Sequence, residues 1–183
     1  MAETAAGNCK VLQDENALNE TIETMASKLV ELVRGEDSLA VVGIRTRGLT
    51  LAERIHEILF NKVQDDLPLG VLDITLYRDD LSTLGSQPIV GPTHLPFDVD
   101  GRTIILVDDV IFTGRTVRAA LEALIAFGRP KAVRLAVLVD RGHREYPVQP
   151  DIVGMKIQTT RNQIVKVHFT EIDGANRVDL LTR

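Results

Sequence analysis

The chain has 183 residues, of which 44% are hydrophobic and 4% aromatic with no Trp, so we expect one domain with an aliphatic core. Its formal net charge of −5 and pI near 5.4 exclude nucleic-acid binding through bulk electrostatics, although a local basic patch stays open. A lone cysteine, Cys9, excludes a disulfide within the chain. Without a signal peptide or a run of about 18 apolar residues, the sequence predicts a cytoplasmic protein with no membrane span.

The N-terminal third predicts an arm, a helix and a strand–turn–helix unit. We expect a single domain over residues 1–183, in which residues 1–12 form a loose arm with a short strand at residues 9–12. Apolar residues at helical spacing predict a helix from about residue 14 to residue 34, with Gly35 as its stop. The run SLAVVGI over residues 38–44 is typical of a buried strand, and residues 49–63 have a helical pattern.

The turn between that strand and that helix reads Arg45-Thr46-Arg47-Gly48. Two arginines just before a helix N-terminus suit an anion such as a pyrophosphate. Turns of this composition are also common as plain connections, and the turn alone does not separate the two interpretations.

A third strand is predicted at residues 68–77, followed by Arg78 and Asp79 and by a loop rich in Gly and Pro over residues 82–96. A long loop inside a compact domain is usually either functional or disordered. A flap that closes over a substrate fits both descriptions, and we therefore predict a flap here.

The most informative stretch lies in the middle of the chain. Residues 103–107 form an apolar, largely β-branched run that predicts a strand buried on both faces, and Asp108 and Asp109 follow it directly. After residues 110–112, the small polar turn 113–116 leads into a helix that extends to about residue 127. The carboxyl end of such a strand is where ligands bind in open α/β sheets.

The residue types at this strand end suggest two half-sites. The turn places hydroxyls and backbone N–H groups at a helix N-terminus, where Gly114 permits close approach of a phosphate monoester. The two carboxylates suit vicinal sugar hydroxyls or a hard cation such as Mg²⁺. A phosphorylated sugar satisfies both halves; the competing interpretation is a pair of solvated acids before an ordinary capped helix.

The remaining chain predicts four strands, at residues 132–139, 152–157, 165–171 and 177–181, the last closing a hairpin. Asp140 and Arg141 come directly after the first of these strands and therefore lie at the same edge of the sheet as Asp108. His168 alternates with apolar neighbours, which predicts that it faces solvent.

The stretch VDDVIFTGRT over residues 107–116 resembles the phosphoribosyl-pyrophosphate (PRPP) signature of the type I phosphoribosyltransferases. The resemblance implies an α/β fold with a central, mostly parallel sheet flanked by helices, a flexible flap and a small C-terminal hood. It also implies that the acids bind ribose hydroxyls, that the turn binds the 5′-phosphate, that Arg45–Arg47 bind pyrophosphate, and that Mg²⁺ arrives with PRPP and meets Asp108 and Asp109 indirectly. The implied PRPP-binding residues are Thr46, Arg47, Val107, Asp108, Asp109, Val110, Ile111, Phe112, Thr113, Gly114, Arg115 and Thr116.

Four longer stretches resemble one branch of that family, the bifunctional pyrimidine operon regulators that are also uracil phosphoribosyltransferases. They are residues 41–55, 69–82, 107–116 and 138–161, with EIDGANRVDLL near the C-terminus. The implied reaction converts uracil and PRPP into UMP and pyrophosphate in a homodimer or homotetramer. The implied catalytic residues are Arg47, Arg78, Asp79, Asp108 and Asp109, and the implied base-binding residues are Asp140, Arg141, Val153 and Ile157.

The same resemblance implies binding of pyr mRNA under the control of UMP or UTP, with Arg141, Arg144 and Lys156 as the basic contacts. Here the chain departs from the family pattern. The stretch NETIETMASK of its first helix, residues 19–28, carries Glu20 and Glu23 and no arginine, and Gln149 and Met155 stand where basic residues are usual. Three interpretations therefore remain: a working uracil phosphoribosyltransferase, an RNA-binding attenuator that senses nucleotides with little or no catalysis, and a phosphoribosyltransferase for another base.

Overall fold

The computed structural model describes residues 9–63, 67–77 and 91–182. Its centre is a five-stranded sheet in the order β3-β2-β4-β5-β6, in which every neighbouring pair is parallel. The strands are β2 (Leu39–Ile44), β3 (Leu69–Leu72), β4 (Thr103–Ile111), β5 (Ala132–Asp140) and β6 (Ile152–Lys156). The predicted mostly parallel sheet is thus confirmed.

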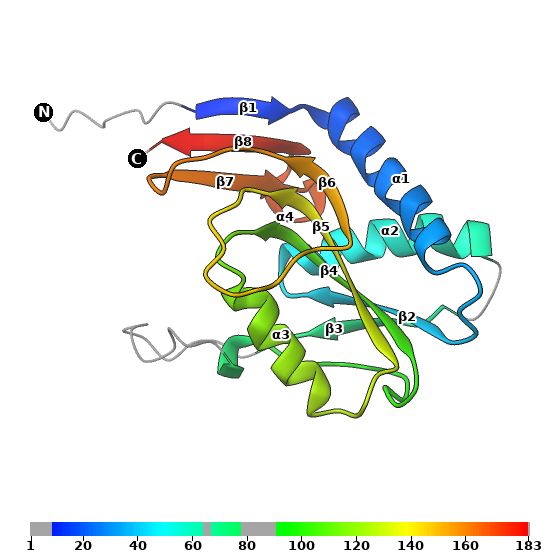
Figure 1. Ribbon diagram of the computed structural model, residues 1–183. Coiled ribbons are helices and arrows are strands. Elements are labelled where there is room, and N and C mark those ends of the chain that lie inside the picture. Colours follow the sequence, from blue (N-terminus) through cyan, green and yellow to red (C-terminus); the bar gives the residue numbers. More distant parts are fainter. Residues whose placement is uncertain (1–8, 64–66, 78–90, 183) are drawn as a thin grey trace, which may run out of the picture.

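Helices cover both faces of this sheet (Figure 1). Helices α1 (Glu15–Leu32) and α2 (Arg47–Val63) pack on one face, and α3 (Arg115–Ile125) packs on the other. Alternate residues of β4 divide between the two core clusters, with Ile105 in the α1–α2 cluster and Ile104 in the α3 cluster. The central strand is therefore apolar on both faces, as its sequence predicts.

A second, antiparallel sheet has the strand order β1-β8-β7 and brings the first and last described strands together. Its strands are β1 (Cys9–Gln13), β7 (Gln163–His168) and β8 (Arg177–Thr182), and the short helix α4 (Thr170–Asp173) connects β7 to β8. Residues 9–12, predicted as a short strand within the arm, pair with β8 from Cys9↔Leu181 onward, while residues 1–8 lie outside the described part. This sheet is the predicted C-terminal hood, with the N-terminal strand added to its edge.

Three strand boundaries differ from the sequence prediction, each because of side-chain or strand pairing. The strand predicted at 68–77 ends at Leu72, since the Asp73 carboxylate accepts the Thr75 backbone N–H at 2.8 Å and starts the 3₁₀ turn Thr75–Tyr77. The strand predicted at 165–171 ends at His168, because Asp173 accepts the Phe169 N–H at 3.2 Å and closes α4.

The third difference matters most for the site. Strand β4 does not stop before Asp108 but continues to Ile111, because β5 pairs with it as far as Ile111↔Asp140. The two acids are thus part of the strand. The helices begin close to their predicted positions, with Asp14 accepting the Ala17 N–H at 3.0 Å as the N-cap of α1.

Candidate active site

The site exists because β4 is longer than its neighbour β2. Pairing between them ends at Gly43↔Val107, while β4 runs on beside β5 for four more residues. Asp108 and Asp109 therefore lie where one side of the strand has lost its partner. A cavity of about 380 Å³ lies at that position. Its lining residues are Ile44, Arg45, Thr46, Arg47, Asp73, Ile74, Thr75, Asp108, Asp109, Val110 and Thr116.

The two adjacent acids of β4 lie in an environment that disfavours their charged forms. Asp108 is only 5% exposed, and its carboxylate accepts the Asp109 backbone N–H at 3.0 Å. Burial, and then the charge of its neighbour, raise the pKa of Asp108 well above its ordinary value; burial also raises the pKa of Asp109. Hydroxyl donors or a bound cation beside these carboxylates would favour their charged forms.

The turn after β4 is held in shape by a segment that follows β5. Gly114 has φ +90°, and a Cβ there would lie 3.3 Å from Tyr146 Cβ. The Thr113 carbonyl accepts the backbone N–H groups of both Glu145 and Tyr146, and Arg115 forms an ion pair with Glu145. The turn thus presents the N-terminus of α3, with Thr116 at the cavity wall, in the arrangement that suits a phosphate.

The two-arginine loop faces the acids across the cavity. The sequence expectation placed the start of the helix at residue 49, but α2 already begins at Arg47. Gly48 brings this helix start very close to β4: a Cβ there would lie 2.8 Å from the Val107 carbonyl oxygen and 3.1 Å from Asp108 Cα. Glycine at this position is therefore required by the close approach of the loop to the acids.

Each arginine of this loop has an aspartate partner that the sequence analysis did not predict. Arg45 Nε lies 3.8 Å from Asp73 Oδ2, and Arg47 Nη2 donates to Asp173 Oδ1 at 2.6 Å. Asp73 also accepts the N–H of Gly91, which lies within the predicted flap, at 2.7 Å. A carboxylate after β3 was visible in the sequence, whereas Asp173 is 126 residues from Arg47 and has no local signal.

The structure therefore brings Thr46, Arg47, Asp108, Asp109, Val110 and Thr116 to one cavity. Val107 and Ile111 are buried in the two core clusters, where only their backbones are free to serve a ligand. Phe112 packs against Arg141 and His143. Arg78, Asp79 and the flap as far as residue 90 lie outside the described residues. The roles assigned to all these residues stay predictions.

The four predicted base-binding residues do not share one surface. Asp140 and Ile157 line a second hollow of about 390 Å³, together with Gly142, Lys156 and Gln158. Val153 packs instead against the α3 core cluster. Arg141 is 6% exposed, and its guanidinium lies 4.0 Å from the Phe112 ring centre while donating to Thr159 Oγ1 and the Thr160 carbonyl.

The three predicted RNA contacts also differ in how far their charges are exposed. Arg144 forms an ion pair with Asp140 at 2.8 Å and donates to the Phe112 and Val148 carbonyl oxygens. Like Arg141, it is engaged within the protein. Lys156 is exposed, and it is the member of the predicted basic set whose charge is at the surface.

The residues present fit a cation that arrives with its ligand rather than a resident one. Within the described ranges, no three His, Cys, Asp or Glu side chains gather as a metal-binding group. Asp108 and Asp109 are a pair, and a pair of carboxylates completes a Mg²⁺ shell only when substrate oxygens and water supply the rest.

Within residues 9–63, 67–77 and 91–182, no helix is long and apolar enough to span a bilayer.

Cavity size alone does not mark this site. A larger hollow, of about 750 Å³, lies at the opposite edge of the sheet, before β2 and β4, and is lined by residues including Gly35, Ser38 and Arg102. There Glu36 is paired with Lys131 at 2.7 Å and with the Thr103 hydroxyl at 2.9 Å. The carboxyl edge is distinguished instead by two buried acids with raised pKa values.

Comparisons with known proteins agree with this geometry. The family model described as Phosphoribosyl transferase domain matches residues 9–171. The protein from Thermus aquaticus named Bifunctional protein PyrR is 50% identical over 169 residues, which cover 92% of this chain and 93% of that protein. The chain belongs to the phosphoribosyltransferase family, within its PyrR branch.

Two further relatives extend the comparison. The Bifunctional protein PyrR of Deinococcus deserti is 53% identical over 156 residues, which cover 85% of each chain. A Trypanosoma cruzi hypoxanthine phosphoribosyl transferase structure matches with a TM-score of 0.73 at 16% identity, covering 100% of this chain and 95% of that one. At that identity the second likeness shows the type I phosphoribosyltransferase fold and not the base.

Proposed function

We infer that this chain is a uracil phosphoribosyltransferase, which converts uracil and PRPP into UMP and pyrophosphate. The observation that carries this proposal is that one cavity joins Asp108 and Asp109, Thr116 at the N-terminus of α3, and the arginine loop. PRPP has a ribose diol, a 5′-phosphate and a pyrophosphate. The two acids, the N-terminus of α3 and the arginine loop offer a partner to each of these groups in turn.

Each element then has a separate task. Asp108 and Asp109 bind the 2′- and 3′-hydroxyls, and the turn at 113–116 binds the 5′-phosphate, which fixes the sugar relative to both edges of the cavity. Arg47 and the backbone of Thr46 bind the pyrophosphate. Transfer breaks the bond between the anomeric carbon and pyrophosphate, forms the bond to uracil N1, and releases the N1 proton.

Positive charge develops on the anomeric carbon while negative charge develops on the leaving pyrophosphate. Arg45 and Arg47 stabilise the second of these charges from the loop, and the buried carboxylates lie beside the first. Mg²⁺ bound with PRPP would supply further neutralisation of the pyrophosphate, with Asp108 and Asp109 as the residues that hold it through the ribose hydroxyls. Asp140 and Ile157, beside Lys156, line the hollow where uracil is proposed to bind.

The test is formation of UMP from uracil, PRPP and Mg²⁺, with hypoxanthine supplied in a parallel reaction. We expect UMP from uracil, no product from hypoxanthine, and a loss of at least about 100-fold in Asp109→Asn. Hypoxanthine turnover in place of uracil turnover would contradict the choice of base. Tight UMP binding without any turnover would favour the attenuator with little or no catalysis.

The second part of the proposal is binding of pyr mRNA, with UMP or UTP as the sensed nucleotide. It is supported by the name of the relatives, which are called bifunctional, and by the exposed position of Lys156. In a titration of pyr leader RNA against salt, Lys156→Glu should weaken binding and flatten the log–log slope by about 0.7–0.9. Lys166→Glu, an exposed lysine of β7, is the control. Equal slopes in all three proteins would contradict a phosphate contact at Lys156.

A homodimer or homotetramer remains part of the proposal, and light scattering of the purified protein measures it directly. The cytoplasmic location expected from the composition also stays a prediction.

A further inference from the structure

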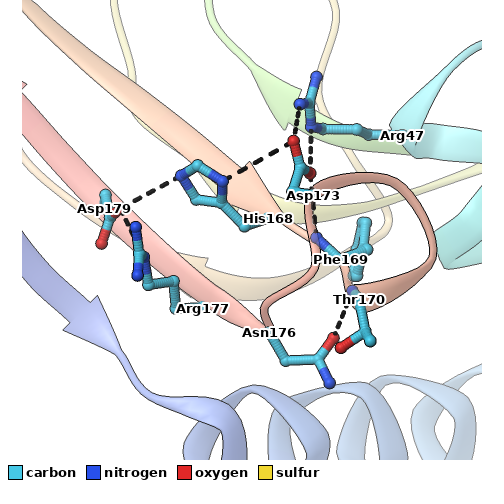
Figure 2. A network of polar contacts seen from close by, with 8 residues as sticks. All are labelled: Arg47, His168, Phe169, Thr170, Asp173, Asn176, Arg177 and Asp179. Carbon is cyan, nitrogen blue, oxygen red and sulfur yellow. Dashed lines mark hydrogen bonds and ion pairs between the residues drawn. The ribbon is translucent and has the colours of Figure 1, made fainter.

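A polar network joins the arginine loop to the C-terminal sheet (Figure 2). Arg47, the first residue of α2, donates from Nη2 to Asp173 Oδ1 at 2.6 Å and from Nε to Asp173 Oδ2 at 3.3 Å. Both carboxylate oxygens and two guanidinium nitrogens take part, so the pair is a two-point fork that fixes the plane of the guanidinium. The third nitrogen, Nη1, points away from Asp173.

The carboxylate that holds Arg47 is itself fixed in position. Asp173 Oδ2 accepts the Phe169 backbone N–H at 3.2 Å, and His168 Nδ1 lies 3.8 Å from Oδ1. On its other side, His168 Nε2 lies 3.2 Å from Asp179 Oδ2, which also accepts from Arg177 Nε at 2.9 Å. His168, predicted to face solvent, is only 12% exposed because it lies between these two carboxylates.

The charge state of Asp173 agrees with this role. Although burial alone would raise it, the hydrogen bond from Arg47, the Phe169 N–H and nearby positive charge hold the pKa of Asp173 below its ordinary value. The aspartate is therefore ionised at neutral pH and keeps its partner arginine oriented.

We propose that Asp173 is a positioning residue, which orients Arg47 so that its free nitrogen meets the pyrophosphate of PRPP. The inference rests on the proposed function, because it assigns the task of one cavity-lining arginine. Asp173 does not line the cavity, and it acts on the ligand only through Arg47. The C-terminal sheet is thereby part of the machinery for pyrophosphate, although 126 residues separate the two partners.

The chain contains a matched control for this idea. Arg54, two turns further along α2, makes a similar fork with Glu171 of α4, at 3.0 Å from Nε and 2.7 Å from Nη2. Both pairs join α2 to α4, but Arg54 does not line the cavity. Loss of Glu171 therefore measures the effect of loosening α4 on α2 without touching the arginine loop.

The experiment compares Asp173→Asn with Glu171→Gln in the full chain. We expect Asp173→Asn to raise the KM for PRPP, and for pyrophosphate in the reverse reaction, by about tenfold, while the Kd for UMP changes by less than about twofold. UMP carries a ribose and a 5′-phosphate but no pyrophosphate, so its binding does not use the arginine loop. Glu171→Gln should leave all three constants within about twofold of wild type.

A double-mutant cycle with Arg47→Lys tests the route of the effect, because a lysine keeps the charge but cannot form the fork. If Asp173 acts through Arg47, adding Asp173→Asn to Arg47→Lys causes little further loss in kcat/KM for PRPP. Asp173→Glu, which keeps the charge and displaces it by one methylene, provides a second folded variant and should also raise the KM for PRPP.

Three results would overturn the proposal: additive losses in the cycle, equal weakening of UMP and PRPP binding in Asp173→Asn, or equal effects of Asp173→Asn and Glu171→Gln. None of them resembles a failure of the proposed function, which would appear as wild-type protein that forms no UMP.

Discussion

The two edges of the central sheet shift the pKa values of their acidic side chains in opposite directions. At the amino edge, Glu36 accepts from Lys131 and from the Thr103 hydroxyl, and these bonds lower the pKa of Glu36 and raise that of Lys131. At the carboxyl edge, further along the same β4, burial raises the pKa values of Asp108 and Asp109, and the charge of Asp109 adds to the effect on Asp108. The first edge is arranged for stability, whereas at the second the charge of Arg47 offsets only part of the cost of burying the two acids, and a ligand can offset more.

The largest effect should come from removing an acid at the carboxyl edge. Asp108→Asn is expected to lower kcat/KM for UMP formation by at least about 100-fold, because the ribose loses a charged partner. The same change removes a buried, uncompensated charge, so the Tm of the ligand-free protein should rise, by about 2–4 °C for each kcal/mol gained. Activity assays and calorimetry of one preparation give both numbers.

The control for that variant is Glu36→Gln, at the other edge of the sheet. It should reverse the pattern, with a slightly lower Tm and unchanged activity. A fall in Tm for Asp108→Asn would contradict the idea that the acid pair is held at a cost in stability.

A smaller effect is expected from adding one methyl group where the loop meets the acids. In Gly48→Ala the new Cβ would lie 2.8 Å from the Val107 carbonyl oxygen, so α2 has to move away from β4. We expect a loss of about 1–3 kcal/mol in unfolding free energy, together with weaker use of PRPP.

Gly35→Ala serves as the comparison at the amino edge. Gly35 has φ +83°, and no atom lies within 4 Å of the position that a methyl group would take there, so its substitution costs backbone strain alone, of about 1 kcal/mol. Urea unfolding and a PRPP titration separate the two variants. If both lower stability and leave the KM for PRPP unchanged, the close approach at Gly48 has no part in the site.

The pH dependence of stability should show the smallest effect. Glu36 has a lowered pKa, so its contribution is present above its ordinary value of 4.5 and is lost as pH falls through the depressed value. Asp108 and Asp109 have raised pKa values, so they destabilise the fold when charged, and this penalty fades as pH falls from neutrality.

Melting curves from pH 7 to pH 3 can separate the two contributions. The Tm difference between wild type and Glu36→Gln should shrink as pH falls below 4.5, and the Tm advantage of Asp108→Asn should shrink as pH falls from 7. A wild-type advantage over Glu36→Gln that stays the same at every pH in this range would mean that the Glu36 charge is not responsible.

The sequence predicted the parts of the site that are contiguous in the chain. The strand, the acids, the turn at 113–116 and the start of α3 lie in one stretch, where apolar runs and glycine determine local structure. The end of β4 was misplaced, because charged residues usually mark a strand end and the pairing with β5 that extends it is not local. Val153 packs against the α3 core cluster, and the base-binding roles of Asp140, Arg141, Val153 and Ile157 stay predictions.

The aspartates behind the two arginines were not predicted for the same reason. Asp173 lies in a four-residue helix, and only the packing of the antiparallel sheet brings it to Arg47. The predicted exposure of His168 failed because the alternation of β7 was interpreted as one buried and one open face. The open face carries Asp179 from β8 and Asp173 from α4.

The first and last described strands lie side by side in the antiparallel sheet, where β1 pairs with β8 (Figure 1). During synthesis β1 therefore leaves the ribosome before every other described element and waits for Arg177–Thr182, which follow all of them. Asp173, the partner of Arg47, belongs to the short helix that connects β7 to this last strand. We therefore expect a nascent chain that lacks β8 to form the central parallel sheet while the antiparallel sheet that carries Asp173 is still incomplete, so that the proposed binding of PRPP through Arg47 would wait for the last strand.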